Sequence, residues 1–143
     1  GGEAISTFEH LYLTAYPLSL TTLFPFSYLS LKYHMNVEQI REYCLSKKGA
    51  EEYQPFGPDN VVFKVKGKMF LLLSLDTSPT QFNVKCDPDK AEALREAYDC
   101  VLPGYHMNKK HWNTIVVDGS APTKLLKEWI DDSYELVGKV KKK

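Results

Sequence analysis

The chain has neither closely spaced cysteines nor a surplus of one charge. Its 143 residues include 18 Lys and Arg against 18 Asp and Glu, so the net charge predicts no polyanionic partner, and any basic surface has to come from local arrangement. Cys44, Cys86 and Cys100 are odd in number, widely spaced and without a C-x-x-C pair. This excludes the disulfide framework of a small secreted protein and indicates reduced thiols in a cytoplasmic protein.

Charged side chains are also missing from residues 10–31. This stretch, "HLYLTAYPLSLTTLFPFSYLSL", contains no Asp, Glu, Lys or Arg. Pro17, Pro25 and several Ser and Thr residues make it a poor membrane span, and no Lys or Arg precedes it as in a secretory signal. We expect residues 1–34 to be an appended or upstream-translated extension and a candidate for self-association, with Met35 as the start of the functional chain.

Two helix starts are marked by capping residues. In "NVEQIREYCLSKKG", Asn36 is the expected N-cap, Gln39 completes a capping box, and Gly49 is the expected end. In "DPDKAEALREAY", Asp87 precedes Pro88 at the first helical position, an arrangement typical of a helix N-terminus. Both segments are therefore predicted to be helical.

The segments between and after these helices are rich in β-branched and aromatic residues. "VVFKVKGKMFLLLSL" predicts a hairpin turning at "KGK", with Phe63 and Val65 on one face and Lys64 and Lys66 on the other. "QFNVKC" and "NTIVVDG" predict further strands, and residues 51–60 predict a loop or an edge entry to a sheet. The segment from Ser120, its expected cap, predicts a C-terminal helix. This order predicts one α+β domain with helices on one face of an antiparallel sheet.

Four segments resemble the MmcQ/YjbR family: "FKVKGKMF", "VKCDPDKAEALRE", "PGYHMNKKHWNTI" and "DGSAPTKLLKEWIDDSYELV". They occur in the family's order and lie within residues 35–140. The resemblance implies a CyaY-like two-layer α+β fold, in which an antiparallel sheet packs against N- and C-terminal helices. It also implies a DNA-binding protein with a double-wing motif, and it brings no set of catalytic residues. We therefore expect a family domain at 35–143 and an N-terminal extension at 1–34.

The hairpin and the 103–115 loop contain the candidates for DNA contact. The nine residues are Lys64, Lys66, Lys68, His106, Asn108, Lys109, Lys110, His111 and Trp112. Lysines attract phosphates, and an exposed His or Trp can stack on a base. Phosphate binding is favoured if Lys64, Lys66, Lys109, Lys110 and the C-terminal tail fall on one continuous face, and disfavoured if they are scattered with carboxylates between them. The competing interpretation is that lysines at turns and edges only keep a sheet soluble.

The 103–115 loop also has a structural interpretation. "PGY" predicts a turn, and Asn108 is expected to cap a short helical turn over residues 109–112. Trp112 is large enough to anchor that turn on the core. On this interpretation His106 and Asn108 hydrogen-bond to backbone and fix the loop.

Two other functions remain open. One is a protein–protein or small-ligand adaptor using residues 1–34 or the open face of the sheet. The other is an enzyme in which His106 or His111 works with Asp118. Two histidines five residues apart do not give four converging ligands, so we expect no metal and no cofactor. The sequence therefore favours a small, non-enzymatic, cytoplasmic binding protein that contacts DNA, without a membrane partner.

Overall fold

The computed structural model describes residues 35–139, so the expectations placed on residues 1–34 and 140–143 lie outside it. The helices are α4 (Val37–Leu45), α5 (Pro88–Ala97) and α6 (Thr123–Gly138). The strands are β1 (Ala50–Tyr53), β2 (Asn60–Val65), β3 (Lys68–Ser74), β4 (Thr80–Lys85), β5 (Val101–Pro103) and β6 (Trp112–Val117). Within residues 35–139, no helix is both long and apolar enough to cross a bilayer.

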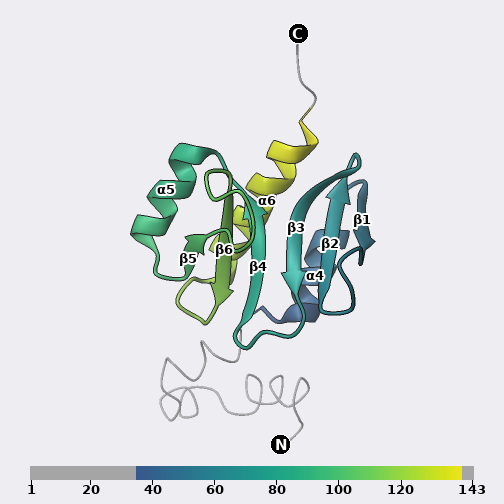
Figure 1. Cartoon of the computed structure of the whole chain (residues 1–143), viewed down its shortest axis with the longest axis horizontal. Coiled ribbons are helices and arrows are strands. Elements are labelled where there is room, and N and C mark those ends of the chain that lie inside the picture. The colour runs from purple at the N-terminus through teal and green to yellow at the C-terminus, as the bar shows by residue number, and fades with distance from the viewer. Residues whose placement is uncertain (1–34, 140–143) are drawn as a thin grey trace, which may run out of the picture. The chain divides into compact units, whose positions relative to one another are not determined.

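The strands form one sheet in the order β1-β2-β3-β4-β6-β5, and all neighbours pair antiparallel. Figure 1 shows α4 and α6 behind this sheet and α5 beside β5. Helix α4 packs on β1, α5 on β5, and α6 mainly on β3 and β4. The predicted α+β architecture, an antiparallel sheet packed against N- and C-terminal helices, is confirmed.

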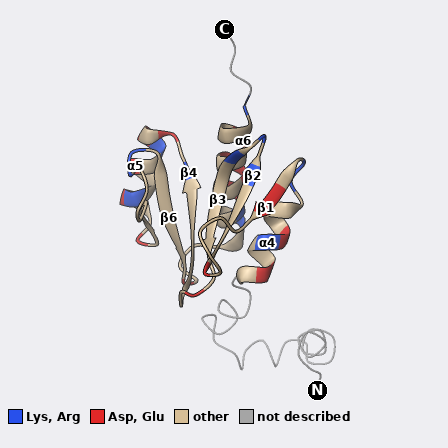
Figure 2. Cartoon of the chain, turned by 45° about the vertical axis from the view of Figure 1, so that its right-hand side comes forward, with Lys and Arg blue, Asp and Glu red and all other residues tan. Residues whose placement is uncertain are grey.

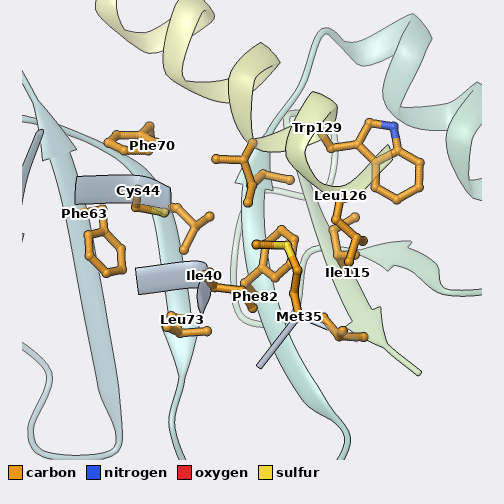
Figure 3. Packing of buried hydrophobic residues seen from close by; sticks show 14 of the residues in the cluster. Met35, Ile40, Cys44, Phe63, Phe70, Leu73, Phe82, Ile115, Leu126 and Trp129 are labelled. Carbon is orange, nitrogen blue, oxygen red and sulfur yellow. The ribbon is translucent and has the colours of Figure 1, made fainter. Parts of the chain in front are cut away.

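The core lies between the sheet and helices α4 and α6. Figure 3 shows Ile40 of α4 and Trp129 of α6 facing buried strand residues such as Phe82. Phe63 is fully buried while its neighbour Lys64 is not, as predicted from alternation along a strand. Burial of this apolar layer supplies the main stabilisation of the domain.

The helix starts follow the capping signals. Gln39 N–H donates to Asn36 Oδ1 at 2.8 Å, and Asn36 N–H donates to Gln39 Oε1 at 3.0 Å, which confirms the capping box. Asp87 caps α5 with Pro88 at the helix start, also as predicted. Helix α4 ends at Leu45, before the expected residue, and Gly49 follows in the turn with φ of 76°.

One local prediction was wrong, and one strand was not predicted. Ser120 does not cap α6, because its N–H and hydroxyl both bind Asp118 Oδ1, at 3.0 and 2.6 Å; Pro122 occupies the cap position. The Asp118 carboxylate, directly after β6, therefore binds the serine that was expected to cap the helix. Strand β5 was missed because it has three residues and ends at Pro103, and proline in a sheet is confined to edges and strand ends.

A bulge in β3 creates the connection between the sheet and α6. Phe63 pairs with Leu71 but Lys64 pairs with Met69, so Phe70 is an extra residue. Phe70 and Leu71 are both fully buried, so two consecutive residues of β3 pack into the core at the bulge.

Ser133 of α6 satisfies the backbone at the bulge. Its hydroxyl donates to Phe70 O at 2.5 Å, and Ser133 Oγ accepts the N–H of Lys85 at 2.8 Å. Ser133 is itself fully buried. The hydroxyl therefore joins β3 to β4 where those strands leave their common ladder, and ties both strands to α6.

Replacing Ser133 with alanine is expected to destabilise the domain. The change leaves Phe70 C=O and Lys85 N–H without this partner, and each buried polar group left unpaired costs about 1–3 kcal/mol. Equilibrium unfolding in urea measures the loss. Ser74→Ala is the matched control, because this half-buried serine of β3 makes no side-chain hydrogen bond within residues 35–139, and its effect is expected within about 0.5 kcal/mol. Equal losses in both variants would contradict the assigned role.

Candidate nucleic-acid interface at the lysine end of the sheet

The turns of the domain are sorted by charge. Because neighbouring strands run antiparallel, successive turns lie at opposite ends of the sheet. One set, with the residue that follows α6, defines what we term the lysine end: residues 46–49, 66–67, 86–87, 104–111 and 139. The opposite set defines the aspartate end: residues 54–59, 75–79, 98–100 and 118–122.

The turns at the two ends differ in their charged side chains. The lysines of the lysine end are Lys47, Lys48, Lys66, Lys109, Lys110 and Lys139. Its acidic side chain is Asp87, which is engaged as the N-cap of α5. The aspartate end has no Lys or Arg and contains Asp59, Asp76, Asp99 and Asp118. Figure 2 shows blue at the β2–β3 hairpin tip and red in loops at the opposite end. A chain of zero net charge therefore has positive and negative turns at opposite ends of its sheet.

A cavity of about 450 Å³ opens at the lysine end. Its cationic and titratable basic side chains are Lys68 of β3, Lys85 of β4, His111 and Lys139. Met69, Pro88, Leu136 and Val137 supply apolar lining, and Cys86 and Asp87 complete it. The hairpin and the 103–115 loop thus share a surface through Lys68 and His111, two residues 43 positions apart in sequence.

Lys66 has a structural role at this end. With Gly67 it forms the hairpin turn, where both residues have positive φ, 53° and 77°, as a two-residue turn between twisted strands requires. Its Nζ donates to Gly138 O at 2.9 Å. The lysine thereby satisfies a carbonyl at the C-terminus of α6, where a positive charge is favourable.

Three other lysines also have partners. Lys64 Nζ lies 4.7 Å from the centre of the Tyr53 ring, on the face of the sheet away from α4 and α6. Lys109 Nζ donates to Gly104 O at 2.9 Å. Lys47 is ion-paired with a carboxylate of α6. These side chains are less available to a ligand than their position in the sequence indicates.

The remaining lysines at or next to this end are available. Lys48, Lys110 and Lys139 belong to the lysine end, and Lys68 and Lys85 lie at the adjoining ends of β3 and β4. Their side chains make no hydrogen bond or ion pair within the described part of the chain. All but the half-buried Lys85 are exposed. Carboxylates lie close by without pairing with these five lysines: Asp87 lines the 450 Å³ cavity, and Asp132 and Glu135 line a second cavity of about 730 Å³ with Lys48 and Lys139.

Asn108 organises the 104–111 loop as predicted. Its Oδ1 accepts the N–H of Lys110 at 2.9 Å, and its carbonyl accepts those of His111 and Trp112 at 3.2 and 3.0 Å. Gly104 N–H donates to Trp112 O at 2.9 Å, and a Cβ on this glycine would lie 2.9 Å from the Trp112 Cβ. Glycine is required there because the two backbones approach so closely.

Trp112 and His106 do not play the structural roles predicted for them. Trp112 is half-buried and lies outside the main hydrophobic cluster. It opens β6 opposite Lys85, and alternation points Asn113 and Ile115 toward the helices instead. The side chain of His106 makes no hydrogen bond among the described residues. Its backbone has a φ of 57°, and its ring centre lies 4.0 Å from the ring centre of Tyr105.

Arg95 of α5 holds the loop, a role the sequence did not reveal. Its Nε donates to Asn113 Oδ1 at 2.7 Å and its Nη2 donates to Lys109 O. Asn113 is buried, and its amide donates in turn to Ala91 O at 3.4 Å. An asparagine in an apolar strand pattern was the available signal, because a buried amide requires partners.

The described residues offer little for catalysis or metal binding. His111 and Asp118 flank opposite ends of the six-residue strand β6, about 20 Å apart along it, so the imagined histidine–aspartate pair does not form. Burial raises the pKa of the Cys44 thiol to about 12 and also raises that of Cys86, which disfavours thiolate chemistry at neutral pH. Within residues 35–139, no three His, Cys, Asp or Glu side chains group as metal ligands.

Sequence comparison connects the chain with one family. The model of the YjbR family matches residues 45–136. The chain is 42% identical to the uncharacterised protein YbdF of Escherichia coli O157:H7 over 83 residues, which are 58% of this chain and 68% of YbdF. It is 31% identical to the uncharacterised protein YjbR of Escherichia coli K12 over 101 residues, which are 71% and 86% of the two chains.

Solved structures give the same relationship. The crystal structure of Deinococcus radiodurans protein DR2400 has 38% identity and a TM-score of 0.71, covering 74% of this chain and 80% of that one. A crystal structure of a Pseudomonas syringae protein has 27% identity and a TM-score of 0.64, covering 72% and 99%. These relatives support family and fold, and their names state no activity.

Arg95→Ala is expected to destabilise the domain more than the loss of another arginine. It removes a partner from the buried Asn113 amide, at a cost of about 1–3 kcal/mol. Arg41→Ala is the matched control, because Arg41 pairs with Glu52 on the surface, where an ion pair contributes about 0–1 kcal/mol. Urea unfolding of both variants makes the comparison. An Arg41 variant as unstable as the Arg95 variant would contradict the role of Arg95 in holding the loop.

Proposed function

Because this chain belongs to the YjbR family, and because its resemblance to that family implies contact with DNA, we propose that it is a small non-enzymatic binding protein whose lysine end binds the phosphate backbone of DNA. One observation carries the proposal: the antiparallel topology collects the available lysines at one end of the sheet and the aspartates of the turns at the other. Such a distribution attracts a polyanion to one end and orients the domain on it.

The proposed binding residues differ in part from the sequence candidates. Lys68, Lys110 and His111 remain, and Lys48, Lys85 and Lys139 join them because they lie at the same end without partners. Lys66 and Lys109 support the turns instead, and Lys64 lies against the Tyr53 ring of β1. In this proposal Lys66 and Lys109 hold the hairpin and the loop in place, and the available lysines contact phosphate.

In this proposal the protein is cytoplasmic and its function is binding alone. All three cysteines are free and buried, which supports a cytoplasmic protein. The proposal includes no chemical reaction, because the charge of the lysines carries the binding. Each available lysine gains a phosphate partner and breaks no ion pair with a carboxylate. Affinity should therefore depend steeply on salt.

The test compares two double variants that remove equal charge. Lys68→Ala with Lys110→Ala removes two available lysines from the lysine end. Lys124→Ala with Lys127→Ala removes two exposed lysines from the first half of α6, next to the aspartate end. Binding of a DNA duplex is measured over a series of salt concentrations. Each phosphate contact contributes about 0.9 to the slope of log K against log salt, so the first variant loses about two and the second close to none.

Two results would contradict the proposal. Wild-type protein that shows no salt-sensitive binding at micromolar concentration does not use its lysine end for DNA. Equal slope losses in the two double variants would mean that binding depends on total charge and is not located at the lysine end.

A further inference from the structure

The sheet has a second face, opposite the one packed on α4 and α6, which we term the open face. Strand register identifies its members on every strand. They include Tyr53, Lys64, Leu72, Asn83, Lys85, Leu102, Trp112, Thr114 and Val116. Leu72, Trp112 and Val116 are half-buried, and Asn83 and Thr114 are buried, so these two polar side chains contribute little accessible surface to the centre of this face.

Exposed rings stand at both sides of the open face. Tyr53 of β1 is 42% exposed, and Tyr105, just beyond β5, is 68% exposed. Tyr105 N–H donates at 3.0 Å to Thr114 Oγ1, and the Thr114 hydroxyl donates to Asn83 Oδ1. Tyr105, the second residue after β5, is thus tied to the open face, with the His106 ring against its own. The backbone of Tyr105 is therefore fixed on this face, and its ring remains open to solvent and to a ligand.

Positive charge accompanies these rings. Lys64 and Lys85 lie on the open face, and Lys85 also lines the cavity of the lysine end, so the face and that end are continuous. The acidic residue beside Tyr53 is Glu51, which accepts the tyrosine hydroxyl at 2.7 Å. A face that carries exposed rings together with lysines matches a ligand that presents flat bases next to phosphates.

We infer that the open face stacks unpaired bases while the lysine end holds their phosphates, so that the DNA bound is single-stranded. The inference rests on the proposed function and names its ligand more narrowly. A duplex keeps its base faces inside its own stack, so Tyr53 and Tyr105 would have no partner on it. A single strand exposes both bases and backbone. The span from β1 to β5 is five strand spacings, roughly 24 Å, enough for several nucleotides.

The test measures fluorescence anisotropy with labelled oligo-dT and with the same strand in duplex with oligo-dA, at low and at moderate salt. Oligo-dT is expected to bind more tightly than the duplex. Tyr105→Ala removes one stacking ring, which should weaken oligo-dT binding about 5- to 100-fold and change duplex binding less than about twofold. Tyr105→Phe keeps the ring and should bind oligo-dT like wild type. Because Tyr105 is mostly exposed, unfolding curves of both variants should match wild type.

The outcomes separate the inference from the proposed function. If the duplex binds with salt sensitivity and at least as tightly as oligo-dT, the inference fails and DNA binding at the lysine end stands. The inference also fails if Tyr105→Ala binds oligo-dT like wild type, since the ring then contributes nothing. If neither form of DNA binds, both fail, and the exposed rings are better explained by a protein partner.

Discussion

Antiparallel pairing of every neighbouring strand sends successive turns to opposite ends of the sheet, and in this chain the two sets of turns carry opposite charge. The separation needs no excess of lysine, because the fold and not the composition produces it. Residues as distant in sequence as Lys68 and His111 come to line one cavity for the same reason. A sequence with zero net charge can therefore present a strong local field.

The lysine end is held in shape by a few polar contacts between sheet and helices. Ser133 joins β3, β4 and α6 at the bulge, Lys66 satisfies the end of α6, and Arg95 holds the 104–111 loop through Asn113. These contacts use some basic side chains as structural elements. The lysines that remain have no carboxylate partners in the described residues, so their charge is directed at solvent and at any ligand that approaches.

Much of the fold could be predicted from local signals, and the candidate site only in part. Asn36 and Asp87 mark helix starts because their side chains bind backbone within three residues, and Phe63 faces the core because strands alternate. Ser120 failed as a cap because Asp118 competes for it. The roles of Lys66 and Arg95 depend on partners 72 and 18 residues away, and such distances are set by the tertiary structure. No local pattern could show which lysines are engaged and which are available.

The most direct test of the account is to map the ligand onto the backbone of the protein. Amide chemical shifts are recorded by NMR while oligo-dT is added to isotopically labelled protein. The account predicts that amides of the lysine end and the open face move, and that those of residues 54–59, 75–79 and 118–122 stay in place. Shifts concentrated at the aspartate end would contradict it.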